Sequence, residues 1–308
     1  VSTTAWLERN GGHRLRSMRE NRLLRIFQDP SLKRKGVSGP GDDCAVLSPP
    51  AGRKLLQTVD QVIGGVHLQL DAKPADYAHK LLRRTISDLA AAGATPWAVS
   101  WTIATPPQWS CAKLRALATA FLAAAEEFHM AVAGGDCSQA AVPVLTCTAL
   151  GLANGRVPGR SGAKPGDVIL VTGKLGGAVS SGAHLRPEPR LKLGQMLVEE
   201  FSPHAMMDLS DGLAADLPRM LSASGCAAQI DLEDLPLNSG LPAGRAAYEA
   251  AVGEGEDYEL LVALAPRSAK RALLDQRFAD IGLTKICSIS VGTQLQWRLL
   301  GKAVRLKS

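Results

Sequence analysis

The stretch DLSDGLAADL, residues 208–217, sets acidic and small residues where a predicted strand runs into a predicted helix. We expect the strand over 204–209 and the helix over 212–224, which leaves Ser210 and Asp211 in the turn between them. A helix N-terminus presents unpaired N–H groups and so favours an anion, but Ser or Asp at this place also serves as an ordinary helix cap. Both interpretations, the ligand contact and the cap, are open for this stretch alone.

Four further stretches set aspartate among small residues in a comparable way: GDDCAVL (41–47), TVD (58–60), SDLAAAGA (87–94) and GGDC (134–137). Aspartate is a poor strand former and an awkward core residue, so the five sites together ask for one explanation. Two carboxylates about 4 Å apart repel each other by roughly 4 kcal/mol at an effective dielectric near 20, so a fold that gathers several of them needs cations there. Hard cations take oxygen ligands, and Mg²⁺ usually arrives with a polyphosphate. The residues therefore predict a Mg²⁺–nucleotide site built from aspartates.

Each of these stretches also has a plain structural interpretation. Gly-Asp-Asp is common turn chemistry, and TVD places Thr58 and Asp60 at the end of a β-rich run, where a strand-end aspartate needs no ligand. Asp88 falls within a helical run, as a cap or a surface residue. The glycines of GGDC let the backbone approach a bound group. Because the chain lacks GxxxxGK[ST] and the protein-kinase HRD and DFG set, no rival nucleotide motif competes with the acidic stretches.

Helical and strand-like runs alternate along the chain without strict β-α-β order, which favours an α+β fold. We expect helices at 74–93, 114–128, 188–200, 212–224 and 266–277. We expect strands at 54–59, 98–105, 142–152, 167–173, 204–209, 226–232, 257–264 and 284–299, and MAVAGG (130–135) is strand-like. The stretch ANGRVPGRSGAKPGD (153–167) is rich in Gly, Pro and charge, and is the best candidate for a domain boundary. The prediction is a flexible extension over residues 1–19, an N-terminal domain over 20–152 and a C-terminal α+β domain over 153–308.

The composition of the 308 residues, 46% hydrophobic and 21% charged, is ordinary for a globular protein and leaves room for two domains. No apolar run approaches the roughly 20 residues of a membrane span. The formal net charge of +6 is mild and suits a polyanionic small substrate. The six cysteines form no CxxC pair, so we expect buried thiols in a reducing cytoplasm. We expect neither a membrane nor a nucleic acid as partner.

In their order along the chain, eight motifs resemble those of thiamine-monophosphate kinases, which belong to the superfamily of aminoimidazole ribonucleotide synthetase. They are GDDCAVL, TVDQVIGGVHL, ISDLAAAGATP, GGDC, GRSGAKPGDVILVTGKLGG, HLRPEPR, DLSDGLAADL and EGEDYEL. The resemblance spans about residues 20–264, and its specificity lies in the ordered set, because no single motif is specific. It implies a two-domain α+β subunit of the aminoimidazole-ribonucleotide-synthetase type, with N-terminal sheets that pair into a barrel across a homodimer. Residues 20–152 would then bind ATP and metal and form the dimer.

The resemblance also implies an activity, the ATP-dependent phosphorylation of thiamine monophosphate to thiamine diphosphate by direct in-line transfer with Mg²⁺. This agrees with the acidic stretches, because phosphoryl transfer needs mostly positioning and charge neutralisation. The implied metal ligands are Asp43, Thr58, Asp60, Asp88, Asp136, Asp208 and Asp211. The implied nucleotide contacts are Gly135, Asp136, Arg160 and Ser210, and the implied thiamine-phosphate contacts are His67 and Glu256. Catalysis would rest on the metals with Asp136 and Asp211, and no residue would act as a covalent nucleophile.

Three departures from the family pattern leave the acceptor open. Cys137 stands where the family has Thr, Glu254 interrupts the Gly-Gly of GGEDYEL, and the closing GKAVRLKS lacks the aromatic segment expected near the thiamine ring. The loss of that ring alone would weaken acceptor binding roughly 2–10-fold, since aromatic stacking contributes about 0.5–1.5 kcal/mol. Two alternatives therefore remain, namely a kinase for another phosphorylated acceptor and a nucleotide-binding protein without catalysis. For His67, the residues alone favour a core or turn histidine.

Overall fold

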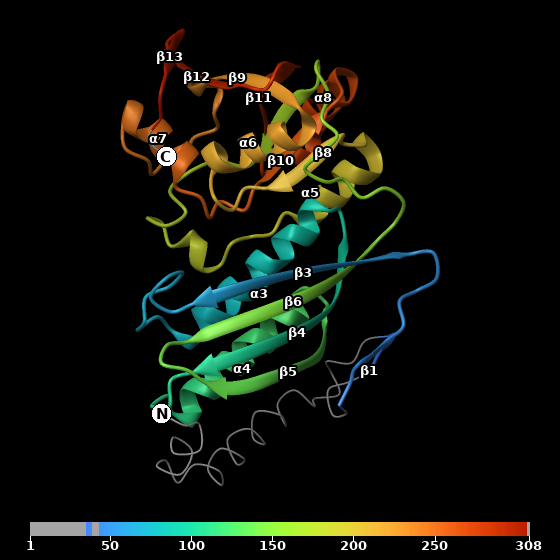
Figure 1. Cartoon of the computed structure of the whole chain (residues 1–308), viewed down its shortest axis with the longest axis vertical. Helices are drawn as coiled ribbons and strands as arrows, with labels where there is room; N and C mark the ends of the chain where they lie inside the picture. The colour runs from blue at the N-terminus through green and yellow to red at the C-terminus, as the bar shows by residue number, and fades with distance from the viewer. Residues whose placement is uncertain (1–34, 39–42, 307–308) are drawn as a thin grey trace. The chain divides into compact units, whose positions relative to one another are not determined.

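The computed structural model describes residues 35–38 and 43–306, so the predicted extension over 1–19 lies outside the described residues (Figure 1). The described chain divides into two compact units. The first unit holds the described residues up to Ala51 together with Gln57–Thr85 and Pro96–Leu150; the second holds Gly52–Leu56, Ile86–Thr95 and the chain from Gly151 onward. Each unit has a sheet of its own.

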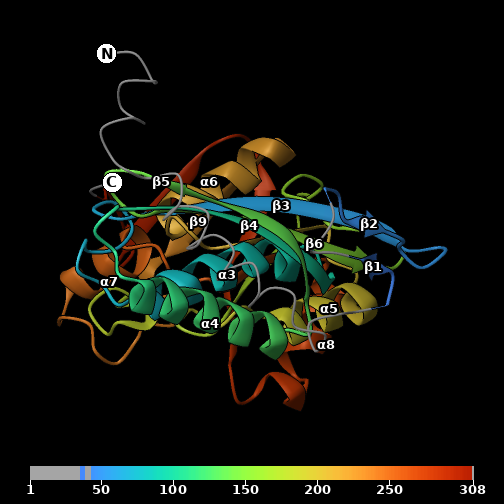
Figure 2. The ribbon, with the colours of Figure 1, turned by 90° about the horizontal axis from the view of Figure 1, so that it is seen from below.

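The first unit is a four-stranded sheet with helices on one face. Its strands lie in the order β3 (Lys54–Ile63), β6 (Val144–Ala153), β4 (Thr95–Thr105) and β5 (Ala131–Gln139). Two helices, α3 (Pro74–Ala91) and α4 (Cys111–Glu127), lie against the same face of this sheet (Figure 2). A separate two-stranded ribbon pairs β1 (Val37–Ser38) with β2 (Val46–Leu47).

The packing of α4 follows directly from its sequence. Ser110 caps the first turn by accepting the N–H of Lys113 at 3.2 Å. The buried side chains recur every three or four residues, as for a helix lying on a sheet: Leu114, Leu117, Ala118, Phe121, Ala124 and Ala125. Phe121 stacks on Trp101 of β4, with ring centroids 3.9 Å apart. The helix is thereby fixed against the sheet between the two strands that it connects.

Strand β5 runs through the GGDC stretch. β4 and β5 are parallel, and their register places Trp101 opposite Gly135. A Cβ on Gly135 would lie 2.3 Å from the carbonyl oxygen of Trp101, so only glycine fits this close approach of the two strands. The glycine thus has a packing role that is separate from any ligand.

The second unit is built on a seven-stranded mixed sheet. In spatial order its strands are β13 (Lys302–Val304), β12 (Leu295–Leu299), β9 (Cys226–Asp231), β11 (Leu283–Val291), β7 (Val168–Thr172), β10 (Leu260–Leu264) and β8 (Ala205–Asp208). β12 and β9 are parallel, whereas β9–β11, β11–β7, β7–β10, β10–β8 and β12–β13 are antiparallel. The α-helices of this unit are α5 (Leu191–Met196), which continues as a π-helical turn over Leu197–Phe201, α6 (Leu213–Ser224), α7 (Arg245–Gly253) and α8 (Pro266–Leu273). Short 3₁₀ turns occupy Ala183–Leu185, Leu232–Asp234 and Gln276–Phe278.

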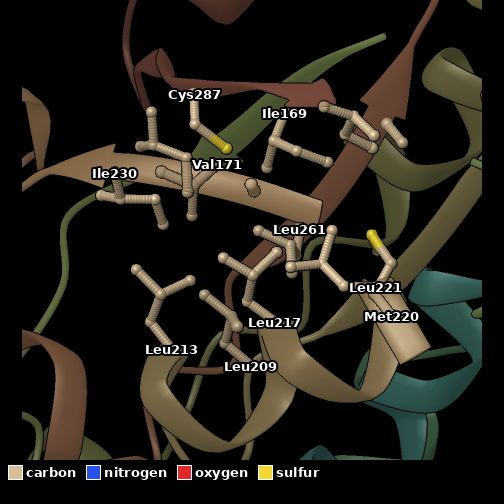
Figure 3. Packing of buried hydrophobic residues seen from close by; sticks show 14 of the residues in the cluster. Ile169, Val171, Leu209, Leu213, Leu217, Met220, Leu221, Ile230, Leu261 and Cys287 are labelled. Carbon is tan, nitrogen blue, oxygen red and sulfur yellow. The ribbon is translucent and has the colours of Figure 1, made fainter. Parts of the chain in front are cut away.

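The central strands of this sheet are buried on both faces. Every residue of β7 and β10 is buried, and successive residues alternate between two apolar clusters. Ile169 and Val171 join the cluster under α6, whereas Val168 and Leu170 join the cluster on the other side. Figure 3 shows side chains of α6 directed at these strands. A strand packed on both faces reads as a continuous apolar run, which is the pattern of DVILVTG.

The expected elements are present, with the following corrections. The run expected over 284–299 is two strands, because the chain turns at Gly292 with a φ of +127°, a conformation that favours glycine. β3 continues to Ile63, so Thr58 and Asp60 lie within the strand and not at its end. The sequence continues Gln-Val-Ile after Asp60, which prolongs the extended run. Helix α7 and the short strands β1, β2 and β13 were not expected.

The cysteines only partly match the expectation of buried thiols. All six are free, and Cys147, Cys226 and Cys287 are buried. Cys44 and Cys111 are exposed, so the expectation is wrong for them. Cys111 occupies a solvent-facing position in the first turn of α4, and Cys44 precedes the short β2. In the described part of the chain, no helix combines the length and the apolar character needed to cross a membrane.

Candidate functional site

The turn between β8 and α6 carries three predicted site residues of the second unit. Asp208 ends β8, opposite Leu260 of β10, and only 5% of it is exposed. Its Oδ2 accepts the hydroxyl of Ser87 at 2.6 Å. Ser87 neighbours Asp88, another predicted metal ligand, which is half-buried in the last turns of α3. The structure therefore brings Asp88 and Asp208 into the same neighbourhood of this unit.

A carboxylate that our sequence reasoning did not single out holds the turn. Asp216, in α6, is fully buried, and its Oδ2 accepts the N–H groups of Ser210 and Asp211 at 3.0 and 2.9 Å. Its Oδ1 accepts Nη1 of Arg219 at 2.6 Å. Burial raises the pKa of Asp216. The sequence signal was an aspartate in the first turn of a helix, where a carboxylate satisfies unpaired N–H groups.

The cap interpretation of this turn is wrong, because the N-cap of α6 is Gly212 and neither Ser210 nor Asp211, whereas the ligand contact stays a prediction. The anion at this helix N-terminus is the carboxylate of Asp216 itself, so the N–H groups of Ser210 and Asp211 are occupied. The hydroxyl of Ser210 and the carboxylate of Asp211 remain the groups through which the turn can meet a ligand. The side chain of Asp211 is 58% exposed and also accepts Nη1 of Arg219 at 2.6 Å.

The EGEDYEL stretch lies directly beside this turn. The N–H of Glu256 donates to the carbonyl of Ser210 at 2.8 Å, and the N–H of Tyr258 donates to the carbonyl of Leu209 at 2.8 Å. Glu256 and Tyr258 both have positive φ, 63° and 51°. Such backbone is uncommon outside glycine and clusters at functional sites. The structure thus places Glu256, a predicted thiamine-phosphate contact, against Ser210, a predicted nucleotide contact.

Two carboxylates of the same stretch hold a glycine loop between β7 and α5. Asp257 accepts the N–H of Gly176 at 3.0 and 3.2 Å, and Glu254 accepts the N–H of Gly177 at 2.7 Å. Burial, and then the neighbouring Glu259 and Glu254 carboxylates, raise the pKa of Asp257 to about 7. The departure at Glu254 therefore has a structural consequence, since its side chain supplies an acceptor to the loop.

The same stretch also contributes Glu259 to an ion pair with Arg190. Glu259 is 4% exposed and accepts Nε and Nη2 of Arg190 at 2.8 and 2.5 Å and the hydroxyl of Thr172 at 2.6 Å. This bidentate geometry is the strong form of the arginine–carboxylate pair. It joins the HLRPEPR and EGEDYEL stretches, which are far apart in the sequence.

Arg160 lies elsewhere in the second unit. Its carbonyl accepts the hydroxyl of Ser224, the last residue of α6, at 3.3 Å. Ser210 and Asp211 precede the other end of that helix. Twelve residues of α-helix rise by about 18 Å, so the structure does not bring the Arg160 backbone next to the turn. The Arg160 side chain is exposed, and its nucleotide contact stays a prediction.

Four of the predicted residues of the first unit lie at two edges of its sheet. Thr58 and Asp60 lie on β3, and Gly135 and Asp136 lie on β5, the opposite edge. Three strand spacings separate these edges by about 14 Å. Asp136 and Asp43 are exposed, whereas Asp60 is half-buried. An ion pair with Arg84 of α3, at 3.2 Å, neutralises Asp60.

His67 occupies the turn that follows β3. Its Nδ1 accepts the N–H of Ile63 at 3.0 Å, and its own N–H donates to the carbonyl of Ile63 at 2.9 Å. The imidazole thus closes a turn, as expected from the residues alone, and its proton belongs on Nε2. Only the Nε2 edge can serve a thiamine-phosphate contact in this arrangement.

The described residues do not form a closed metal cage. Among residues 35–38 and 43–306, no three His, Cys, Asp or Glu side chains gather in a group that could hold an ion. The carboxylates are instead spread over the two edges of the first sheet and the Asp208–Asp211 turn.

Comparison with known proteins identifies relatives over most of the chain. Residues 41–153 match the family model "AIR synthase related protein, N-terminal domain", and residues 164–282 match "AIR synthase related protein, C-terminal domain". The thiamine-monophosphate kinase of Rhodopirellula baltica is 34% identical over 274 residues, with 84% of this chain and 85% of that protein covered.

Two solved structures extend the comparison. The thiamine-monophosphate kinase of Stenotrophomonas maltophilia K279a superposes with a TM-score of 0.79 and 32% identity, and covers 92% of this chain and 96% of its own. AaThiL complexed with AMPPCP and TMP superposes with a TM-score of 0.73 and 26% identity, and covers 90% of this chain and 92% of its own. The shared architecture is a two-domain α+β fold with mixed sheets.

Proposed function

We propose, from the premise that this chain belongs to the thiamine-monophosphate kinase family of AIR-synthase-related proteins, that it transfers the γ-phosphoryl group of ATP to thiamine monophosphate. The products would be ADP and thiamine diphosphate. The observation that carries the proposal is the hydrogen bond from the Glu256 N–H to the Ser210 carbonyl, 2.8 Å long. It joins the backbone of Glu256, the expected contact for thiamine monophosphate, to that of Ser210, the expected contact for the nucleotide. The AaThiL complex with AMPPCP and TMP supports the same pair of ligands.

Mg²⁺ belongs to this proposal, and the donor set fits it. Asp136 and Asp211 offer exposed carboxylate oxygens, the ligands that this ion prefers. Asp60 and Asp211 each already face an arginine, which indicates that both positions call for positive charge. When bound, Mg²⁺ would neutralise the triphosphate and the developing charge on the transferred group.

The residues of the second unit have distinct roles in this proposal. Ser210 would contact the nucleotide through its hydroxyl, because Asp216 holds its N–H. Glu256 would complement the positively charged thiazolium ring of thiamine, and its Oε2 accepts the hydroxyl of Tyr258 at 3.2 Å. With no side chain assigned as a nucleophile, transfer would be a single in-line step. Positioning and charge neutralisation are then the main contributions of the protein.

We further infer a homodimer that works in the cytoplasm. The predicted ligands on β3 and β5 lie at opposite edges of the first sheet, and a paired sheet would cover exposed apolar side chains such as Val59, which is 58% exposed. The six free thiols suit a reducing compartment. Light scattering should give twice the chain mass of 32.4 kDa, and a monomer at micromolar concentration would contradict the inference.

Thermal shifts combined with an acceptor panel test the proposed function. Mg²⁺ with ATP should raise the melting temperature well above either component alone, and Asp136→Asn should remove most of that shift. Asp275→Asn is the matched control, since this aspartate lies in an exposed arginine network. ADP release should then require thiamine monophosphate among thiamine, thiamine monophosphate and aminoimidazole nucleotides. An unchanged shift in Asp136→Asn would refute the nucleotide site, and release with another acceptor alone would favour the alternative kinase.

A further inference from the structure

Both oxygens of the Asp216 carboxylate accept hydrogen bonds, one from the turn before α6 and the other from a side chain of α6 itself. One oxygen takes two backbone N–H groups, those of Ser210 and Asp211, and the other takes the guanidinium of Arg219. The side chain is 1% exposed. Hydrogen bonds to a buried carboxylate are costly to break, because the group cannot be rehydrated. Asp216 therefore fixes the backbone from which the Ser210 and Asp211 side chains project.

Arg219 joins this buried carboxylate to an exposed one. The same atom, Nη1, lies 2.6 Å from Oδ1 of Asp216 and 2.6 Å from Oδ2 of Asp211. The Arg219 side chain is 45% exposed and that of Asp211 is 58% exposed. The Asp216 end of the bridge is consequently held firmly, whereas the Asp211 end is a solvent-exposed ion pair of small net stability.

We propose that Asp216 and Arg219 are positioning residues for the cation site, and that Arg219 holds the Asp211 carboxylate in the ligand-free protein and competes with the divalent cation for it. The proposal rests on the proposed function, in which Asp211 binds Mg²⁺. Asp216 retains the arginine when the cation takes Asp211, since its own contact is buried. The turn therefore keeps one geometry with or without ligand. Only the positive partner of the Asp211 carboxylate changes, from the Arg219 guanidinium to the cation.

The test is a Mg²⁺ titration of the thermal shift caused by a fixed, non-hydrolysable ATP analogue. Arg219→Gln removes the competing charge, so half of the maximal shift should occur at a Mg²⁺ concentration roughly two- to five-fold lower than in the unmodified protein, the factor expected for an exposed ion pair. Arg219→Lys keeps the charge and should restore the original midpoint. Arg277→Gln is the matched control, because Arg277 is also exposed and also bridges two carboxylates, and its midpoint should not move.

Asp216→Asn is a second variant, which should shift the Mg²⁺ midpoint in the opposite direction. It leaves Arg219 paired with Asp211 alone and loosens the turn, so the Mg²⁺ midpoint should rise. A residue with a merely structural role would lower the melting temperature without Mg²⁺ and leave the midpoints where they are. A midpoint that is unchanged or raised in Arg219→Gln, in a protein whose unmodified form responds to Mg²⁺, overturns the inference and leaves the proposed function intact. A complete lack of Mg²⁺-dependent shift in the unmodified protein overturns the proposed function, and this inference with it.

Discussion

The ion pair between Arg190 and Glu259 should be the most sensitive point of the second unit to a single substitution. Arg190→Met keeps much of the apolar stem but removes the guanidinium, which leaves Glu259, 4% exposed, with the hydroxyl of Thr172 as its remaining side-chain donor. Removing one partner of a buried pair costs about 3–5 kcal/mol, because a charge is left buried without compensation. At about 2–3 °C per kcal/mol for a unit of this size, the melting temperature should fall by roughly 6–15 °C.

Differential scanning fluorimetry and urea unfolding would measure this loss. Arg277→Met is the matched control, since Arg277 pairs with Glu200 and Asp275 at the surface and should cost at most about 1 kcal/mol. The double variant Arg190→Met with Glu259→Gln should recover much of the loss, because it removes the stranded charge. The ion pair does not have this role if Arg190→Met is no more destabilising than Arg277→Met, or if the double variant is as unstable as the single one.

Two further predictions concern pH and packing. The pKa of Asp257 lies at about 7 in the folded protein, against 3.8 for an ordinary aspartate. Its contribution to the free energy of unfolding is therefore complete below pH 4 and is lost as pH rises towards 7. Asp257→Asn should flatten this decline by about 1–3 kcal/mol between pH 5 and 8, and an unchanged pH profile of the melting temperature would count against the assigned environment. A Cβ on Gly194 would lie 2.0 Å from the carbonyl oxygen of Ala90, so Gly194→Ala should cost at least about 1–3 kcal/mol in urea unfolding, whereas Gly240→Ala, with open space around it, should be nearly neutral.

The fold was predictable where local periodicity and burial agree. The apolar run of DVILVTG and the 3.6-residue period that begins at Pro74 correspond to β7 and α3 within two residues. The continuation of β5 through GGDC could not be predicted from propensity, because Gly and Asp are depleted in strands. The strand continues there because it pairs with β4, and at Gly135 the two strands approach so closely that only glycine fits beside the Trp101 carbonyl. This cause lies in the pairing of two strands and cannot be read from the GGDC stretch alone.

For the candidate site, the sequence supplies a list of residues to test but not the contacts that those residues make. The hydrogen bond between Ser87 and Asp208 joins residues 121 positions apart, so no local sequence pattern can predict it. Asp216 was part of a quoted motif, yet its function depends on where the backbone N–H groups of the preceding turn point. Glu254 stood out only as a departure from a pattern, and the structure gives it a partner, the N–H of Gly177. Residue types were readable from the sequence, whereas partners required the fold.

The most direct test of the central claim follows the phosphoryl group itself. The purified chain would be incubated with Mg²⁺, ATP labelled in its γ-phosphate and thiamine monophosphate at millimolar concentration, and the products would be separated by chromatography. We expect the label in thiamine diphosphate, formed in equal amount to ADP, and none of it on the protein. Binding of the ATP analogue without any labelled thiamine diphosphate would contradict the account, and so would a labelled protein.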